Sequence, residues 1–84
     1  MPLVPSPTPS PTIREMVAAN LDVAIHASGR TNRNVGEAIG STEHQVWRWR
    51  KGKVSPSTEN LIALAETLGV TIEWLSTGHD RSAA

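Results

Sequence analysis

The chain has 84 residues, which allows one small domain with a modest hydrophobic core. It contains no cysteine, so disulfides and cysteine-ligated metals cannot supplement that core, and a reducing cytoplasm is the expected location. The formal net charge is +0 at pH 7, and no apolar run has the length of a membrane span, so we expect a soluble protein without a membrane partner.

The charged residues are distributed unevenly along the chain. Residues 30–53 carry six basic and two acidic side chains, a local net charge of +4, while residues 1–29 sum to −1 and residues 54–84 to −3. A basic face of this kind can orient a phosphate backbone even on a neutral molecule. The simpler interpretation, a solvated surface with chance clustering, stays open on charge alone.

Five of the six prolines lie in residues 1–11, interleaved with Ser and Thr. Such a segment lacks the backbone donors that regular structure needs, so we predict a disordered tail, with a proline-rich ligand for another protein as the alternative. A domain is predicted over residues 12–78, and residues 79–84 are expected to fray.

The first helix is predicted to begin after Thr12, because Thr12 and Glu15 form a capping-box pattern. Gly29 is the expected stop. Helical spacing assigns one apolar stripe of this helix to the core: Ile13, Met16, Val17, Leu21, Ala24, Ile25 and Ser28.

Two short helices are predicted next, one over residues 32–39 capped by Thr31 and one over residues 42–51 that begins at Thr42. Gly36 inside the first costs about 1 kcal/mol relative to alanine, which indicates that the second helix packs closely against it. Val46 and Trp49, three residues apart, are predicted to form the buried edge of the second helix.

Two further helices complete the predicted fold. Ser57 caps the first, which has Leu61, Ile62, Leu64, Ala65 and Leu68 on its apolar face and ends at Gly69. Thr71 caps a short last helix over residues 72–77, in which Ile72, Trp74 and Leu75 are apolar. The three histidines, His26, His44 and His79, lie far apart without metal-ligand spacing, so we expect neither an enzyme nor a bound metal or cofactor.

The segment from Thr31 to Gly52 resembles the lambda-repressor-like helix-turn-helix domains of the phage repressor and Cro type, the XRE family. The resemblance continues through Pro56-Ser57, Leu61, Leu64, Ala65, Leu68-Gly69-Val70 and Ile72-Glu73-Trp74-Leu75. It implies an all-α five-helix fold in which helices 2 and 3 form the helix-turn-helix. It also implies a regulator of transcription, a repressor or a Cro-like switch, in the cytoplasm of a bacterium or a phage-infected host cell. Such a protein would bind a double-stranded DNA operator as a homodimer, with residues 42–51 in the major groove.

The resemblance and the side-chain chemistry together give the expected site. The candidates for contact with bases are Glu43, His44, Gln45, Trp47 and Arg48. The candidates for contact with phosphates are Asn32, Arg33, Arg50, Lys51 and Lys53, and those for the dimer interface are Trp74 and Leu75.

Several alternatives stay open at this point. Glu43 is either a reader of cytosine or an N-terminal charge that only stabilises its helix. Arg48 contacts either guanine or a phosphate. Trp47 contacts a thymine methyl group or a sugar, extends the core, or contacts a protein partner. The competing function is a protein-interaction module, such as an antitoxin or an adaptor.

Overall fold

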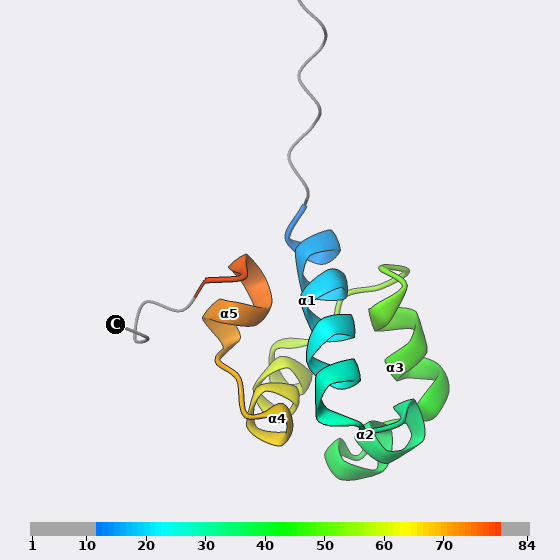
Figure 1. The fold of residues 1–84 in the computed structure, drawn as a ribbon. Coiled ribbons are helices and arrows are strands. Elements are labelled where there is room, and N and C mark those ends of the chain that lie inside the picture. Colours follow the sequence, from blue (N-terminus) through cyan, green and yellow to red (C-terminus); the bar gives the residue numbers. More distant parts are fainter. Residues whose placement is uncertain (1–11, 80–84) are drawn as a thin grey trace, which may run out of the picture.

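The computed structural model describes residues 12–79, which form five α-helices and, within that range, no strand. The helices are α1 (Ile13–Ser28), α2 (Asn32–Ile39), α3 (Glu43–Arg50), α4 (Thr58–Leu68) and α5 (Ile72–Thr77) (Figure 1). The expected all-α five-helix fold is therefore confirmed. The predicted tail over residues 1–11 lies outside the described residues, and so do residues 80–84 of the tail predicted over residues 79–84.

Every helix begins at a serine or threonine that the sequence identifies as its N-cap. Each hydroxyl accepts a hydrogen bond from the backbone amide three residues further on, and the caps are Thr12, Thr31, Thr42, Ser57 and Thr71. The capping box between Thr12 and Glu15 is complete. These contacts satisfy amides that have no partner inside the helix, so the local sequence sets the start of each helix.

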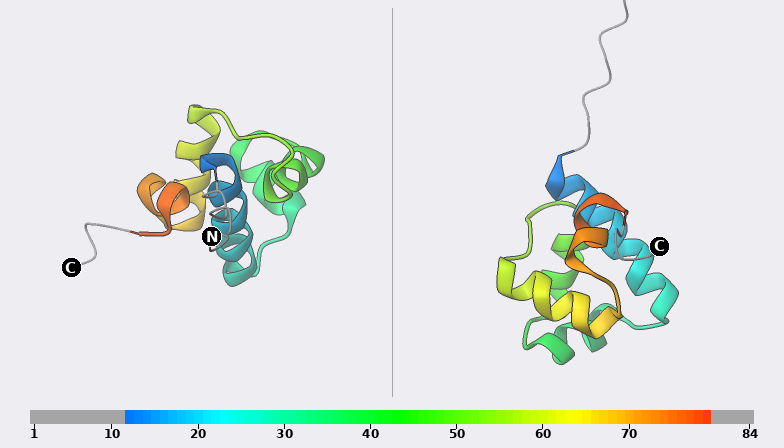
Figure 2. Two further views of the ribbon diagram at one scale, coloured as in Figure 1. Left: turned by 90° about the horizontal axis from the view of Figure 1, so that it is seen from above. Right: turned by 90° about the vertical axis from the view of Figure 1, so that its left-hand side faces the viewer.

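Helix α1 lies at the centre of the bundle, with α3 on one side and α5 on the other (Figures 1 and 2). Trp49 of α3 is the largest fully buried side chain, 1% exposed, and Val46 is 0% exposed, so the predicted buried edge of α3 is confirmed. The core around them consists of Leu21, Ile25, Val35, Leu64, Ala65 and Leu75. Burial of Val46 and Trp49 fixes which side of α3 faces solvent.

Four side chains that the sequence assigns to apolar faces are instead exposed: Ser28, Ile13 at 70%, Ile62 at 42% and Ile72 at 41%. Ile13 and Ile72 are the first residues of α1 and α5. Ile62 lies beside the buried stripe of α4. Helical periodicity therefore identifies the centre of each apolar face correctly and overestimates its width and length.

Gly36 confirms the close approach of α2 and α3. A Cβ atom at this position would lie 2.9 Å from the carbonyl carbon of Thr42 and 3.2 Å from the amide nitrogen of Glu43. The two helices therefore touch through their backbones, which only glycine permits, and the start of α3 is held firmly against α2. No helix in the described range is long and apolar enough to cross a membrane.

Candidate nucleic-acid interface

The five side chains predicted to contact bases lie along one helix, α3, on the sides that its buried edge leaves uncovered. Their exposure differs: Glu43, His44 and Trp47 are exposed, while Gln45 and Arg48 are half-buried. The helix thus presents an anion, an imidazole, an indole, an amide and a guanidinium to solvent within two turns. Such a surface can accept, donate and make apolar contact, which are the interactions that distinguish base pairs in a major groove.

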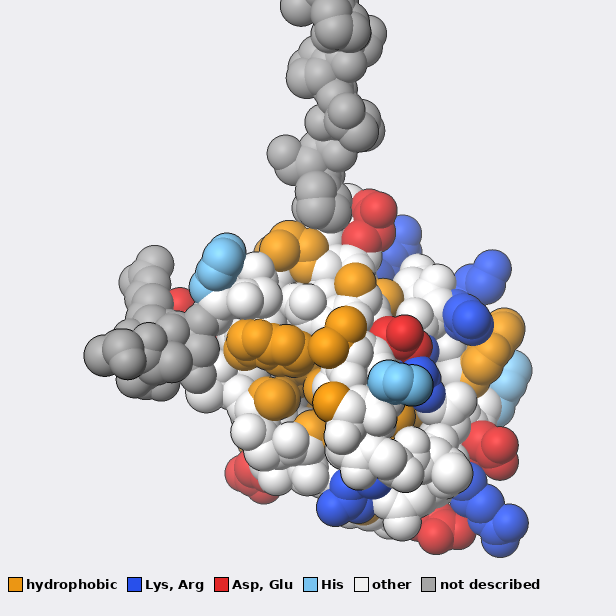
Figure 3. Space-filling view, viewed as in Figure 1, with side chains coloured by type: hydrophobic (Ala, Val, Ile, Leu, Met, Phe, Trp, Pro, Cys, Tyr) orange, Lys and Arg blue, Asp and Glu red, His pale blue; other side chains and the backbone are white. Residues whose placement is uncertain are grey.

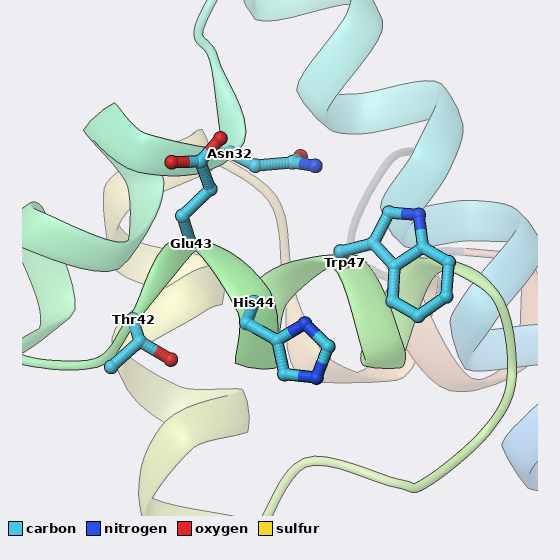
Figure 4. A pocket seen from close by; sticks show the side chains of 5 residues that line it. All are labelled: Asn32, Thr42, Glu43, His44 and Trp47. Atoms are coloured by element: carbon cyan, nitrogen blue, oxygen red, sulfur yellow. The ribbon is translucent and has the colours of Figure 1, made fainter.

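His44 and Trp47 form an aromatic platform on this surface. Their rings are stacked, with centroids 5.6 Å apart and an angle of 17° between their planes (Figure 4). Trp47 is 40% exposed and does not belong to the core cluster, so the alternative in which it extends the core is wrong. The platform offers a broad apolar face in the middle of an otherwise polar helix surface.

Arg48 and Gln45 are half-buried neighbours on α3. Arg48 Nη1 donates a long hydrogen bond of 3.4 Å to Gln45 Oε1. Such a long bond contributes little, so the guanidinium keeps donors for another acceptor. Gln45 is half-buried, whereas His44 is exposed.

A hollow of about 430 Å³ opens where the start of α2 meets the start of α3. It is lined by Asn32, Thr42, Glu43, His44 and Trp47 (Figure 4). The structure therefore places one predicted phosphate contact, Asn32, beside three of the predicted base contacts.

Arg50 forms a network that connects three helices. Its Nε and Nη2 atoms donate to Asp22 Oδ1 at 2.8 and 2.7 Å, and its Nη1 atom donates to Asn32 Oδ1 at 2.6 Å. Asp22 belongs to α1, Asn32 to α2 and Arg50 to α3. Asp22 is not among the predicted site residues, because no local sequence pattern indicates a partner 28 residues away.

The other basic residues differ in how they are engaged. Arg33 pairs with Glu37 at 3.2 Å on a highly exposed part of α2, and Arg30 donates to Asn34 at 2.7 Å. Lys51 and Lys53 make no ion pair with any residue in the range 12–79. The exposed ion pair between Arg33 and Glu37 is weak, so Arg33 can exchange its partner. Lys51 and Lys53 have no partner to exchange among the described residues and are therefore the most available cations beside α3.

The loop after α3 sets the positions of these two lysines. Gly52 has a φ of 72°, and its amide donates to the Trp49 carbonyl while the amide of Lys53 donates to the Arg48 carbonyl. This is a Schellman motif, in which the left-handed residue is usually glycine. The chain therefore turns sharply, and both lysines stay at the C-terminal end of α3.

The predicted dimer contacts lie on the opposite side of α1. Leu75 is 0% exposed and packs in the core of its own chain, so its assignment to a dimer surface is wrong. Trp74 is half-buried and lines an apolar hollow of about 290 Å³ together with Val23, Ala24, Ala27, Ser28, Leu68 and Val70. Hydrophobic side chains gather on this face over α1 and α5 (Figure 3).

The site contains no metal-binding cluster. Among residues 12–79, no group of three or more His, Asp or Glu side chains is arranged to hold an ion.

Relatives of known structure share this arrangement of helices. The clp gene regulator ClgR from Corynebacterium glutamicum superposes with a TM-score of 0.75 and 25% identity, over 80% of this chain and 71% of that protein. The P22 c2 repressor, solved in complex with a synthetic operator, superposes with a TM-score of 0.72 and 19% identity, over 75% of this chain and 96% of the repressor.

Similarity in sequence leads to the same group of proteins. An uncharacterised HTH-type transcriptional regulator of Haemophilus influenzae is 54% identical over 39 residues, which cover 46% of this chain and 16% of that protein. This chain therefore matches only a small part of that relative's length. A helix-turn-helix family model matches residues 27–75, more than half of the chain and all of α2, α3 and α4. The chain belongs to the helix-turn-helix family.

Proposed function

We propose that this protein binds a specific double-stranded DNA site and regulates transcription, as a repressor or a Cro-like switch, with α3 in the major groove. The observation that carries the proposal is the outer side of α3, where chemically diverse side chains surround an aromatic platform and unpaired lysines follow at the end of the helix. The backbone contact at Gly36 supports it, because a helix that reads bases must be held at a fixed position.

Base readout depends on the exposed side chains of α3. Arg48 has the planar fork that holds O6 and N7 of guanine together, which discriminates by about 1–3 kcal/mol against a wrong base. Glu43 accepts from the amino group of cytosine, and the platform of His44 and Trp47 contacts a thymine methyl group or a sugar. Gln45, which is half-buried, makes a weaker contact with a base.

Phosphate contacts set the position of the helix on the duplex. Lys51 and Lys53 contact the backbone at the end of α3, and Arg33 does so after exchanging its exposed partner Glu37. Asn32 is the first residue of α2, where the helix dipole and the first backbone amides also favour an anion.

The DNA-bound form is a homodimer in this proposal. Trp74, with the apolar hollow beside it, lies across α1 from the DNA-binding side, and Val23 at its edge is 58% exposed. A second copy would cover this surface and place two α3 helices about 34 Å apart on a near-palindromic site. Sedimentation of the protein with and without its site tests this, and Trp74→Ala should shift the complex toward a monomer.

One selection experiment tests the function directly. Duplexes bound from a random pool are sequenced, and the affinity for the selected site is measured at two salt concentrations. We expect one enriched sequence and an affinity that falls steeply with salt, because lysines displace counterions from phosphates. A flat salt dependence, or no preference over random duplex, would contradict the proposal.

The protein-interaction module is the second candidate. It is favoured by the apolar hollow at Val23, Leu68 and Trp74 and by the exposure of Trp47. The two functions separate in a pair of variants. If the protein reads DNA, Arg48→Ala weakens its preference for the selected site. If the partner is a protein, Trp47→Ala weakens the principal interaction and Arg48→Ala does not.

A further inference from the structure

We infer that Arg50 is a positioning residue that does not contact DNA itself. It fixes the side-chain amide of Asn32, so that the NH₂ group of that amide is presented to a DNA phosphate. The inference rests on the proposed function. It replaces the expectation that Arg50 is a phosphate contact and gives Asn32 a defined orientation in that role.

The charge of Arg50 is already matched within the protein. Two of its nitrogens donate to Asp22 Oδ1 and a third donates to Asn32 Oδ1, all at 2.8 Å or less. The Arg50 side chain is only 21% exposed. A phosphate would have to compete with a carboxylate at bonding distance, and the neutralised pair adds little to the attraction of the face for DNA.

The same contact decides which end of the Asn32 amide faces outward. A guanidinium only donates hydrogen bonds, so the amide oxygen must be the end that faces Arg50. The Nδ2 atom then points elsewhere, and it makes no hydrogen bond with any residue in the described range. Figure 4 shows this side chain reaching across α3 between Glu43 and Trp47, at the edge of the hollow.

A fixed amide matters because its two ends have opposite effects on a phosphate. The NH₂ group donates to phosphate oxygens, whereas the amide oxygen repels them. Without Arg50, the amide would rotate, and the nearby Glu43 carboxylate would compete for its donors. Loss of one hydrogen bond to a charged group should weaken binding about tenfold or more.

The test compares Arg50→Met, Asn32→Ala and the double variant on the selected DNA site. Lys51→Met is the matched control, because it removes one positive charge at the next position. The measurements are affinity against salt, loss of affinity on replacing single phosphates by uncharged methylphosphonates, and thermal unfolding.

Arg50→Met is made together with Asp22→Asn, because Arg50→Met alone would leave the Asp22 carboxylate without its cation. We expect this charge-neutral change to weaken binding about tenfold while leaving the slope of log K against log salt concentration as in the wild type. Lys51→Met should reduce the slope of log K against log salt concentration by about 0.9, because one phosphate contact is lost. Arg50→Met and Asn32→Ala should both abolish sensitivity to the same methylphosphonate, and the double variant should bind no more weakly than Asn32→Ala. A smaller salt slope for Arg50→Met with Asp22→Asn would overturn the inference. So would a double variant in which the losses of affinity from Arg50→Met and Asn32→Ala multiply and map to different phosphates.

A second variant keeps the test valid if Arg50→Met does not fold. Asn32→Asp retains an acceptor for Arg50, removes the outward donor and adds a negative charge that repels phosphate. We expect it to lose at least as much affinity as Asn32→Ala, and wild-type affinity would overturn the inference. A wild-type protein without salt dependence or site preference would overturn the proposed function itself, which is a distinguishable result.

Discussion

The inner and outer sides of α3 differ in almost every physical respect. On the inner side, Val46 and Trp49 are at most 1% exposed and pack among the side chains of other helices. On the outer side, His44 and Trp47 are exposed, and their rings stack on each other. The inner residues therefore contribute to the stability of the fold, and the outer residues are available for a partner. Substitutions on the two sides should separate folding from binding.

The largest effect is expected from Trp49→Ala, which removes the largest buried side chain. Such a truncation costs about 3–5 kcal/mol of unfolding free energy, much of the stability of a small domain. Urea denaturation followed by circular dichroism measures it. Trp47→Ala is the matched control, and a similar loss there would break the distinction between the two sides.

Gly36→Ala tests how tightly the start of α3 is held. The new Cβ would lie 2.9 Å from the Thr42 backbone, so α2 and α3 must move apart. We expect a loss of about 1–3 kcal/mol, although alanine alone would favour the helix by about 1 kcal/mol. Ala38→Gly, on the exposed side of α2, is a control for helix propensity. A higher melting temperature for Gly36→Ala would refute the close contact.

Arg48→Ala should affect binding without affecting folding. We expect a loss of about 1–3 kcal/mol in discrimination between the selected site and a variant site, because one bidentate base contact disappears. The melting temperature should stay near that of the wild type. Equal weakening on all sequences would instead identify Arg48 as a phosphate contact.

The smallest effect is expected at the capping box, far from both sides of α3. Backbone and side-chain hydrogen bonds from Thr12 lower the pKa of Glu15 in the folded protein. The ionised carboxylate therefore stabilises the fold above the pKa it has in the unfolded chain, and this contribution is lost as pH falls through the lowered pKa.

Thr12→Ala should lower the melting temperature by a few degrees at neutral pH, with a smaller difference from the wild type in acid. Thermal unfolding at a series of pH values measures both effects. Ile13→Ala, at the exposed neighbouring position, is the control. A difference that grows toward low pH would contradict the role of Glu15.

Local signals in the sequence predict most of the fold. The caps at Thr31 and Thr42 and the close approach at Gly36 follow from residue chemistry within a few positions. The burial of Val46 and Trp49 follows from helical spacing. Each feature depends on neighbours along the chain, so a single sequence contains the information.

The rest depends on how distant segments meet. The ion pair between Asp22 and Arg50 joins helices that no local pattern relates, so Arg50 looks like one more cation of a basic face. Leu75 follows the half-buried Trp74, and only the packing of α5 on α1 shows that it belongs to the core. The stack of His44 on Trp47 likewise requires the rotamers of both side chains.

The three tryptophans provide separate spectroscopic reporters. The chain has no tyrosine or phenylalanine, so its near-ultraviolet absorption and fluorescence come from indole alone. Trp49 is fully buried, Trp74 half-buried beside the apolar hollow, and Trp47 exposed on α3. Variants that keep one indole each should report unfolding from Trp49, self-association from Trp74 and docking of α3 from Trp47, without an attached dye.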